Sequence, residues 1–232
     1  MNNIKKALEN GQSIWLDSIS RDMIRSGELQ MFIDSGITGV TSNPSIFDKA
    51  IAESDIYDKS LIEYAKDGVN SQIVFERLAV DDIRDAADVL RAVYDGASMR
   101  DGYVSIEVSP ALAADTAGTI TEARRLWAAI DRPNVMIKVP GTPEGVPAIK
   151  TLISEGINVN VTLLFSLDAY TAAANAYIEG LSDFAKAARG MPSAVASVAS
   201  FFVSRVDSAV DNALPDGHEL KGKIGIANAK IA

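Results

Sequence analysis

The stretch Val135-Met136-Ile137-Lys138-Val139-Pro140 predicts a buried β-strand with one lysine inside it. Lys138 is the lysine of this chain that has apolar residues running up to it and away from it on both sides. Apolar surroundings disfavour the charged form of a lysine and lower its pKa, which raises the fraction of neutral, nucleophilic amine. A Schiff-base lysine is activated in this way. From this strand alone, a lysine that snorkels along a strand edge to water is the more common explanation. The choice between a snorkelling and a nucleophilic lysine therefore depends on the rest of the sequence.

Strand-like segments alternate with helix-like segments on both sides of this stretch. Residues 72–94 carry apolar side chains at helical spacing, although Val80-Asp81-Asp82 is a point at which they could divide into two helices. Thr119-Ile-Thr-Glu122 has the spacing of a capping box that opens a helix ending at Ile130, and Ser166 is placed to cap a helix from Leu167 to about Arg189. The predicted strands are residues 13–17, 39–43, 103–109, 135–140, 158–165 and 194–203. Alternating strands and helices indicate parallel strands joined by right-handed crossovers.

Polar and apolar residues alternate along several of these strands. In residues 103–109, valine and isoleucine occupy one face while Ser105, Glu107 and Ser109 occupy the other. In residues 158–165, Val159, Val161 and Leu163 share a face opposite to asparagine and threonine. Because crossover helices cover parallel sheets, a wet face is unexpected, and a closed barrel with polar residues inside resolves the conflict. We therefore predict an α/β fold of the (β/α)8 TIM-barrel type, incomplete with about six parallel strands, in a single domain over residues 1–232.

Composition excludes several classes of function. The chain has 232 residues and a net charge of −9, whereas a nucleic-acid surface needs a basic stripe. It has no cysteine, so neither a disulfide framework nor a thiolate metal site is expected, and the lone His218 lies in a turn-like stretch. The N-terminus has no apolar signal region and no apolar run reaches about 20 residues. We expect a cytoplasmic protein that binds neither membrane nor nucleic acid.

The barrel prediction gathers one set of polar residues at equivalent depth in six successive strands. They are Asp17, Asn43, Glu107, Lys138, Asn160, Thr162 and Ser200. A lysine nucleophile needs groups that move protons, and two carboxylates supply them, while amides and hydroxyls hold a polyhydroxylated substrate. Each residue alone has an ordinary explanation: a helix cap at Asp17, a turn at Asn43 or a buried ion pair at Glu107. Their joint occurrence favours an active site, and carboxylates paired with an amine rather than with histidines indicate no metal.

The motifs that carry these residues resemble those of the transaldolases, from about residue 12 to the end of the chain. They are Ser13-Ile-Trp-Leu-Asp17, Gly39-Val-Thr-Ser-Asn43-Pro-Ser-Ile-Phe47, Val104-Ser-Ile-Glu107-Val108, Val135-Met-Ile-Lys138-Val-Pro140, Asn158-Val-Asn160-Val-Thr162-Leu-Leu-Phe-Ser166 and Ala199-Ser200-Phe-Phe-Val-Ser-Arg205. The motifs around Asn43 and Thr162, taken together, are highly specific for this family. The segment Val139-Pro-Gly-Thr-Pro-Glu-Gly145 is similar to the longer bacterial type; its glycines look like turn chemistry, because a phosphate-binding P-loop would end in Gly-Lys-Ser/Thr.

The resemblance implies a reaction of the pentose phosphate pathway that moves a dihydroxyacetone unit between sugar phosphates such as fructose 6-phosphate and sedoheptulose 7-phosphate. It implies that Lys138 attacks the ketone, that Glu107 and Thr162 move protons through a water, and that Asp17 takes the C4 hydroxyl proton. Three further residues would hold the three-carbon unit: Asn43, Asn160 and Ser200. Arg205 would bind the substrate phosphate, for which a solvated arginine at a helix start is the alternative. No cofactor is implied, because the imine itself accepts the electrons.

The resemblance also implies two further strands and a second phosphate-binding arginine, for which this chain has no counterpart, so we expect C-terminal βα units to be missing. A six-stranded sheet leaves two edges unpaired, which favours a homo-oligomer formed through exposed edges. Two alternatives therefore stay open. One is an aldolase that releases dihydroxyacetone to water, and the other is a catalytically impaired fragment or assembly module.

Overall fold

The computed structural model describes residues 2–232 and contains one six-stranded sheet in which the strands lie in the order of the sequence. The strands are β1 (Trp15–Leu16), β2 (Gly39–Val40), β3 (Val104–Glu107), β4 (Val135–Pro140), β5 (Val159–Leu164) and β6 (Ser197–Phe201). The pairs β1–β2, β2–β3 and β5–β6 are parallel. All six predicted strands exist, and β4 has the predicted bounds, whereas the others are shorter than predicted.

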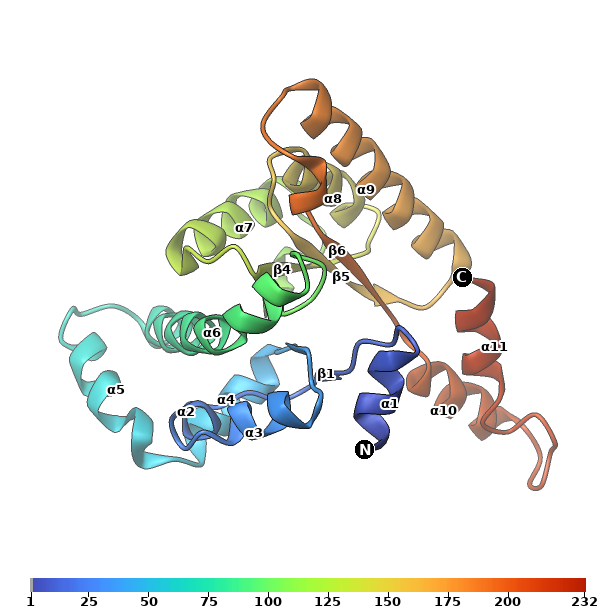
Figure 1. The fold of residues 1–232 in the computed structure, drawn as a ribbon, viewed down its shortest axis with the longest axis horizontal. Helices are drawn as coiled ribbons and strands as arrows, with labels where there is room; N and C mark the ends of the chain where they lie inside the picture. The colour runs from blue at the N-terminus through green and yellow to red at the C-terminus, as the bar shows by residue number, and fades with distance from the viewer. Residues whose placement is uncertain (1) are drawn as a thin grey trace. The chain divides into compact units, whose positions relative to one another are not determined.

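Along the chain, at least one helix separates each strand from the next, and the colours of Figure 1 follow this order from the blue N-terminus to the red C-terminus. The α-helices are α1 (Asn3–Glu9), α2 (Arg21–Arg25), α3 (Glu28–Ser35), α4 (Pro44–Ala52), α5 (Asp58–Ala65), α6 (Ser71–Gly96), α7 (Thr116–Ile130), α8 (Gly145–Ser154), α9 (Leu167–Lys186), α10 (Ser204–Ala213) and α11 (Ile224–Ile231). Short 3-10 turns are η1 (Asp55–Tyr57), η2 (Pro110–Leu112) and η3 (Pro192–Ala194). Strands in sequence order with helical crossovers are the topology of the first six units of a (β/α)8 barrel, so the predicted fold class is confirmed. Within residues 2–232, no helix has the length and hydropathy needed to cross a bilayer.

The chain forms two compact units. Unit 1 comprises Met1–Glu107 and Arg124–Ile137, and unit 2 comprises Val108–Ala123 and Lys138–Ala232. The division falls inside β4, so this strand contributes to both units. The single domain over residues 1–232 stays a prediction.

In unit 1, α6 is a single helix of 26 residues, so the possible division at Val80-Asp81-Asp82 does not occur. Asn70 caps its first turn by accepting a hydrogen bond from the Ile73 N–H at 2.9 Å. Asp82 is fully buried in the middle of the helix, where its carboxylate bonds to side chains from outside the helix rather than to its own backbone. The helix therefore tolerates a residue that usually favours caps and turns.

The capping box predicted at Thr119 is wrong, because α7 begins at Thr116. Thr119 is buried inside the helix and donates to the Leu112 carbonyl at 3.0 Å, while Glu122 accepts from the Ser109 N–H at 2.8 Å. Asp115 provides the side-chain oxygen at the start of α7, because its Oδ1 accepts a hydrogen bond from the Gly118 N–H in the first turn at 2.9 Å. The prediction for α9 is confirmed, since Ser166 caps it by accepting from the Ala169 N–H at 3.2 Å.

In unit 2, β5 contains a bulge. Val161 pairs with Ala199 and Leu164 pairs with Phe201, so two residues of β5 lie opposite Ser200 alone. The second of the two, Leu163, has a φ of 59°, in the left-handed region. The extra residue shifts the alternation of faces, and Leu163 is 42% exposed while Leu164 is buried. The prediction that Leu163 shares a face with Val159 and Val161 is therefore wrong.

Candidate active site

Lys138 lies in the middle of a strand that is buried at all six positions, and its own exposed fraction is 8%. The Val108 N–H, one residue after β3, donates to the Lys138 carbonyl at 3.2 Å and fixes the backbone at this point. A lysine buried to this degree does not have the exposure of a snorkelling side chain on a strand edge. The strand prediction is thus confirmed, and the role of Lys138 as a nucleophile stays a prediction that its burial supports.

Two more candidates of unit 2 are joined by a hydrogen bond. Ser200 in β6 donates through its hydroxyl to Oδ1 of Asn160 in β5 at 2.7 Å. Asn160 is 1% exposed, so this bond is made where an unsatisfied amide would be costly. The bond fixes the orientation of the Asn160 amide, which a side chain that recognises a substrate hydroxyl needs.

Thr162 occupies the bulge of β5 and is buried. Within residues 2–232, its Oγ1 has no hydrogen-bond partner. Leaving a buried hydroxyl without a partner costs about 1–3 kcal/mol, and such groups in native proteins call for an explanation such as a bound ligand or water. Bulges and strained residues such as Leu163 gather at functional sites, so the geometry suits a hydroxyl that acts through a bound water.

Arg205 is the second residue of α10 and is exposed. Its guanidinium lies 4.6 Å from the centroid of the Phe202 ring, and that ring stacks on Phe165 with centroids 5.0 Å apart. Stacking of this kind orients a guanidinium while leaving its forked donors in the plane available to a phosphate. Its exposure also agrees with the solvated arginine that was the alternative, so its role stays a prediction.

In unit 1, Asp17 directly follows β1 and is exposed. It lines a pocket of about 480 Å³ between the segment from Asp17 to Asp22 and helix α4, together with Lys49 and Glu53. The alternative explanation as a helix cap is wrong, because Ser20 caps α2 by accepting from the Met23 N–H at 3.1 Å. Asp17 therefore presents its carboxylate to a pocket without a capping duty.

Asn43 is the N-cap of α4, where its Oδ1 accepts from the Ile46 N–H at 3.0 Å and Pro44 opens the helix. The turn given as the alternative for Asn43 is therefore wrong, because the residue caps a helix and its oxygen has a structural role. Capping orients the side-chain amide nitrogen and does not use it. Glu107 ends β3 and is half-buried.

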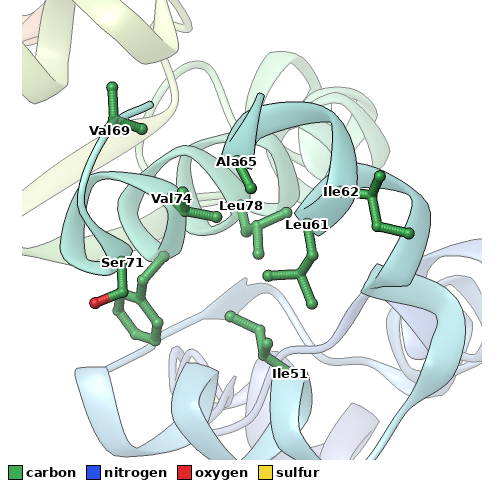
Figure 2. A pocket seen from close by; sticks show the side chains of 9 residues that line it. Ile51, Leu61, Ile62, Ala65, Val69, Ser71, Val74 and Leu78 are labelled. Carbon is green, nitrogen blue, oxygen red and sulfur yellow. The ribbon is translucent and has the colours of Figure 1, made fainter. Parts of the chain in front are cut away.

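Sequence reasoning missed one polar cluster, formed in unit 1 by Arg21, Tyr57, Ser60 and Asp82. Arg21 is the first residue of a five-residue helix, and its partners in the cluster lie 36 to 61 positions away in the sequence. No local sequence pattern therefore predicts the cluster. It also missed an apolar pocket of about 630 Å³ between α4, α5 and α6, which Figure 2 shows. Its lining residues are Ile51, Leu61, Ile62, Ala65, Val69, Ser71, Val74, Phe75 and Leu78, none of which is a candidate site residue.

His218 lies in a turn, as expected, and its Nδ1 accepts from the Leu220 N–H at 3.2 Å. In the part of the chain that the structure describes, histidines, aspartates and glutamates do not gather in groups of three or more that could hold a metal ion.

Parallel strands in sequence order, with a lysine buried in the fourth, define an α/β protein of the barrel class. The family described as Transaldolase/Fructose-6-phosphate aldolase matches residues 14–232, and the chain belongs to this family. It is 51% identical to a transaldolase of Trichodesmium erythraeum (strain IMS101), over 97% of this chain and 63% of that protein. It is 48% identical to transaldolase 2 of Nostoc sp. (strain PCC 7120 / SAG 25.82 / UTEX 2576), over 100% and 65%. It is also 48% identical to a transaldolase of Thiobacillus denitrificans (strain ATCC 25259 / T1), over 100% and 66%. The family resemblance is confirmed, and the chain spans slightly less than two thirds of the length of these relatives.

Proposed function

We propose that this chain forms a Schiff base through Lys138 and transfers a dihydroxyacetone unit between sugar phosphates. The observation that carries the proposal is the burial of Lys138 in β4, at 8% exposure, in a chain about half identical to transaldolases. The mechanism needs Asp17, Asn43 and Glu107 of unit 1 to act together with residues of unit 2. It therefore also rests on the proposal that residues 1–232 fold as one barrel domain.

The reaction begins when the neutral Lys138 amine attacks the C2 carbonyl of a ketose phosphate such as fructose 6-phosphate. A C–N bond forms to give a carbinolamine, in which the carbonyl oxygen has gained one proton as the amine nitrogen loses one. A second proton, delivered by an acid, lets this hydroxyl leave as water, and an iminium remains. Glu107 moves the protons, assisted by a water bound to Thr162, whose hydroxyl has no partner within residues 2–232.

Cleavage follows when Asp17 accepts the C4 hydroxyl proton. The C3–C4 bond breaks, its electron pair moves into the iminium, and glyceraldehyde 3-phosphate leaves while the three-carbon unit stays on Lys138 as an enamine. A second aldehyde, such as erythrose 4-phosphate, takes up this unit by the same steps in reverse, and water then releases the lysine. The iminium accepts the electron pair, so the mechanism calls for no cofactor.

Binding of the substrate is assigned to the remaining candidates. Asn160 and Ser200, joined by their 2.7 Å hydrogen bond, would hold the hydroxyls of the three-carbon unit together with Asn43. Arg205 would bind the substrate phosphate with donors oriented by its stacking on Phe202. Binding of the distant phosphate lowers the barrier at the reacting carbon only if both ends are held.

A close second candidate is an aldolase that releases dihydroxyacetone to water, because the matching family includes fructose-6-phosphate aldolase. The two activities differ in their need for an acceptor. Release of dihydroxyacetone and glyceraldehyde 3-phosphate without erythrose 4-phosphate identifies the aldolase, and product formed only with the acceptor identifies the transferase.

Borohydride reduction in the presence of fructose 6-phosphate, followed by peptide mass analysis, tests the Schiff base. We expect a covalent adduct on Lys138 that is absent from Lys138→Met and retained in Lys150→Met. Lys150 is a suitable control because it is an exposed lysine of unit 2 whose amine pairs with Glu179 at 2.7 Å. No adduct at millimolar substrate, or an adduct at another lysine, would show a silent fragment or a different site.

A further inference from the structure

Arg21 is a charged residue held almost out of water, with an exposed fraction of 2%. Its Nε donates to Oδ1 of Asp82 at 2.7 Å, and its Nη1 donates to the Ser60 hydroxyl at 2.8 Å. The Tyr57 hydroxyl accepts from the Arg21 backbone N–H at 2.8 Å and donates to Oδ2 of Asp82 at 2.7 Å. The guanidinium also lies 4.7 Å from the Tyr57 ring centroid. Arg21 is thus fixed through both its side chain and its backbone.

This arrangement is costly to bury. Desolvation raises the pKa of the Asp82 carboxyl against the lowering effect of its hydrogen bonds to Tyr57 and Arg21, and burial raises the pKa of the Tyr57 phenol. Buried ion pairs of this kind are often matched or bettered in stability by apolar residues of the same volume. The cluster is therefore better explained by the geometry it imposes than by the stability it adds.

The geometry concerns the segment between β1 and α2, which carries Asp17. At its start, the Leu16 carbonyl accepts from the Thr41 N–H at 2.8 Å. At its end, Arg21 is bound to the cluster, and between them Ile19 is 1% exposed. Within residues 2–232, the Asp17 carboxylate makes no side-chain hydrogen bond or ion pair. Its position is therefore set by the backbone, which β1 holds on one side and Arg21 on the other.

We propose that the Arg21–Tyr57–Asp82 cluster is a positioning device for Asp17, so that it governs cleavage of the C3–C4 bond and not formation of the Schiff base. The inference rests on the proposed function, in which Lys138 and Asp17 serve these two steps separately. The Tyr57 hydroxyl is its central group, because it bonds both to the Arg21 backbone N–H and to the Asp82 carboxylate of α6.

The test compares two partial reactions in Tyr57→Phe. Borohydride trapping with dihydroxyacetone measures Schiff-base formation on Lys138 without any bond cleavage. A single turnover with fructose 6-phosphate measures release of glyceraldehyde 3-phosphate, which requires Asp17. We expect trapping within twofold of the unaltered chain and cleavage slower by about tenfold to a hundredfold, the range that a displacement of about 1 Å produces.

Tyr64→Phe is the matched control. Tyr64 also bonds to an α6 carboxylate, that of Asp81 at 2.5 Å, and is not among the residues that bond to the backbone of Arg21. We expect both partial reactions of this variant within twofold of the unaltered chain. Asp82→Asn, which keeps the size of the side chain and removes its charge, should repeat the split seen in Tyr57→Phe.

The possible outcomes separate the two proposals. Unchanged cleavage in Tyr57→Phe, or equal loss of trapping and cleavage, overturns the positioning role while the Schiff base stands. Loss of cleavage in Tyr64→Phe to the same extent overturns it too, since the effect would then not depend on the Asp17 segment. An unaltered chain that gives no adduct refutes the proposed function and this inference with it.

Discussion

Replacing Gly145 with alanine adds a methyl group at the point where α8 begins, beside the end of β4. A Cβ at this position would lie 1.8 Å from the Pro140 carbonyl oxygen and 3.1 Å from Oγ1 of Thr142. An ordinary contact between carbon and oxygen is above 3 Å, so the strand end and the helix start must separate by more than 1 Å. Both are buried, and the atom in the way is backbone, which has no rotamer to change.

The cost of this substitution follows from the contact. Overpacking a buried site costs about 1–3 kcal/mol, and a clash with backbone belongs at the upper end, so we expect a loss of about 3 kcal/mol in the free energy of unfolding. For a chain of this size, that corresponds to a fall of roughly 6–12 °C in the thermal midpoint. Because Pro140 is two residues after Lys138, the displacement should also slow borohydride trapping on Lys138 by about tenfold.

Gly96→Ala is the control, since a Cβ at Gly96 meets nothing within 4 Å. This variant should be unchanged or more stable by about 0.5–1 kcal/mol, with unchanged trapping. Denaturant titration of both variants, with trapping measured on the same samples, decides the matter. If Gly145→Ala is as stable as the unaltered chain, or if Gly96→Ala loses as much, the close approach of α8 to β4 does not constrain the lysine strand.

Two further predictions rest on single hydrogen bonds, and a third rests on the edge of the sheet. Asn43→Ala should lose about 1 kcal/mol of stability with its cap, whereas Asn43→Asp should keep the cap, and both should raise KM for fructose 6-phosphate if the amide nitrogen binds substrate. The hydrogen bond to Asp81 raises the pKa of Tyr64 to about 12. The stability that this bond gives is therefore complete below about pH 10 and is lost as the pH rises toward 12. In Tyr64→Phe, the free energy of unfolding should fall less between pH 10 and pH 12 than in the unaltered chain, and an equal fall would contradict the assignment. We propose that β6, which pairs with β5 alone in the described part of the chain, supports self-association, so that Ala199→Lys shifts sedimentation toward the monomer; a dilute stable monomer of the unaltered chain would disprove this.

The segments best predicted from the sequence are those in which local pattern and tertiary burial agree. The run Val135–Pro140 is apolar enough to be a buried strand wherever it packs, and its bounds were predicted correctly. Ser166 begins α9 for a local reason, since its oxygen needs only an N–H three residues later. At Thr119 the same kind of local pattern failed, because burial against Leu112 let the helix start earlier.

The sequence by itself determined the order of strands and helices, the family and the set of residues proposed to do chemistry, because periodicity and motifs are properties of neighbours along the chain. Tertiary structure alone decided that Leu163 turns outward in a bulge and that Arg21 is held by hydrogen bonds to Tyr57 and Asp82. These features depend on hydrogen bonds and packing between residues far apart in the chain. Their energies are set by burial, which no local pattern specifies.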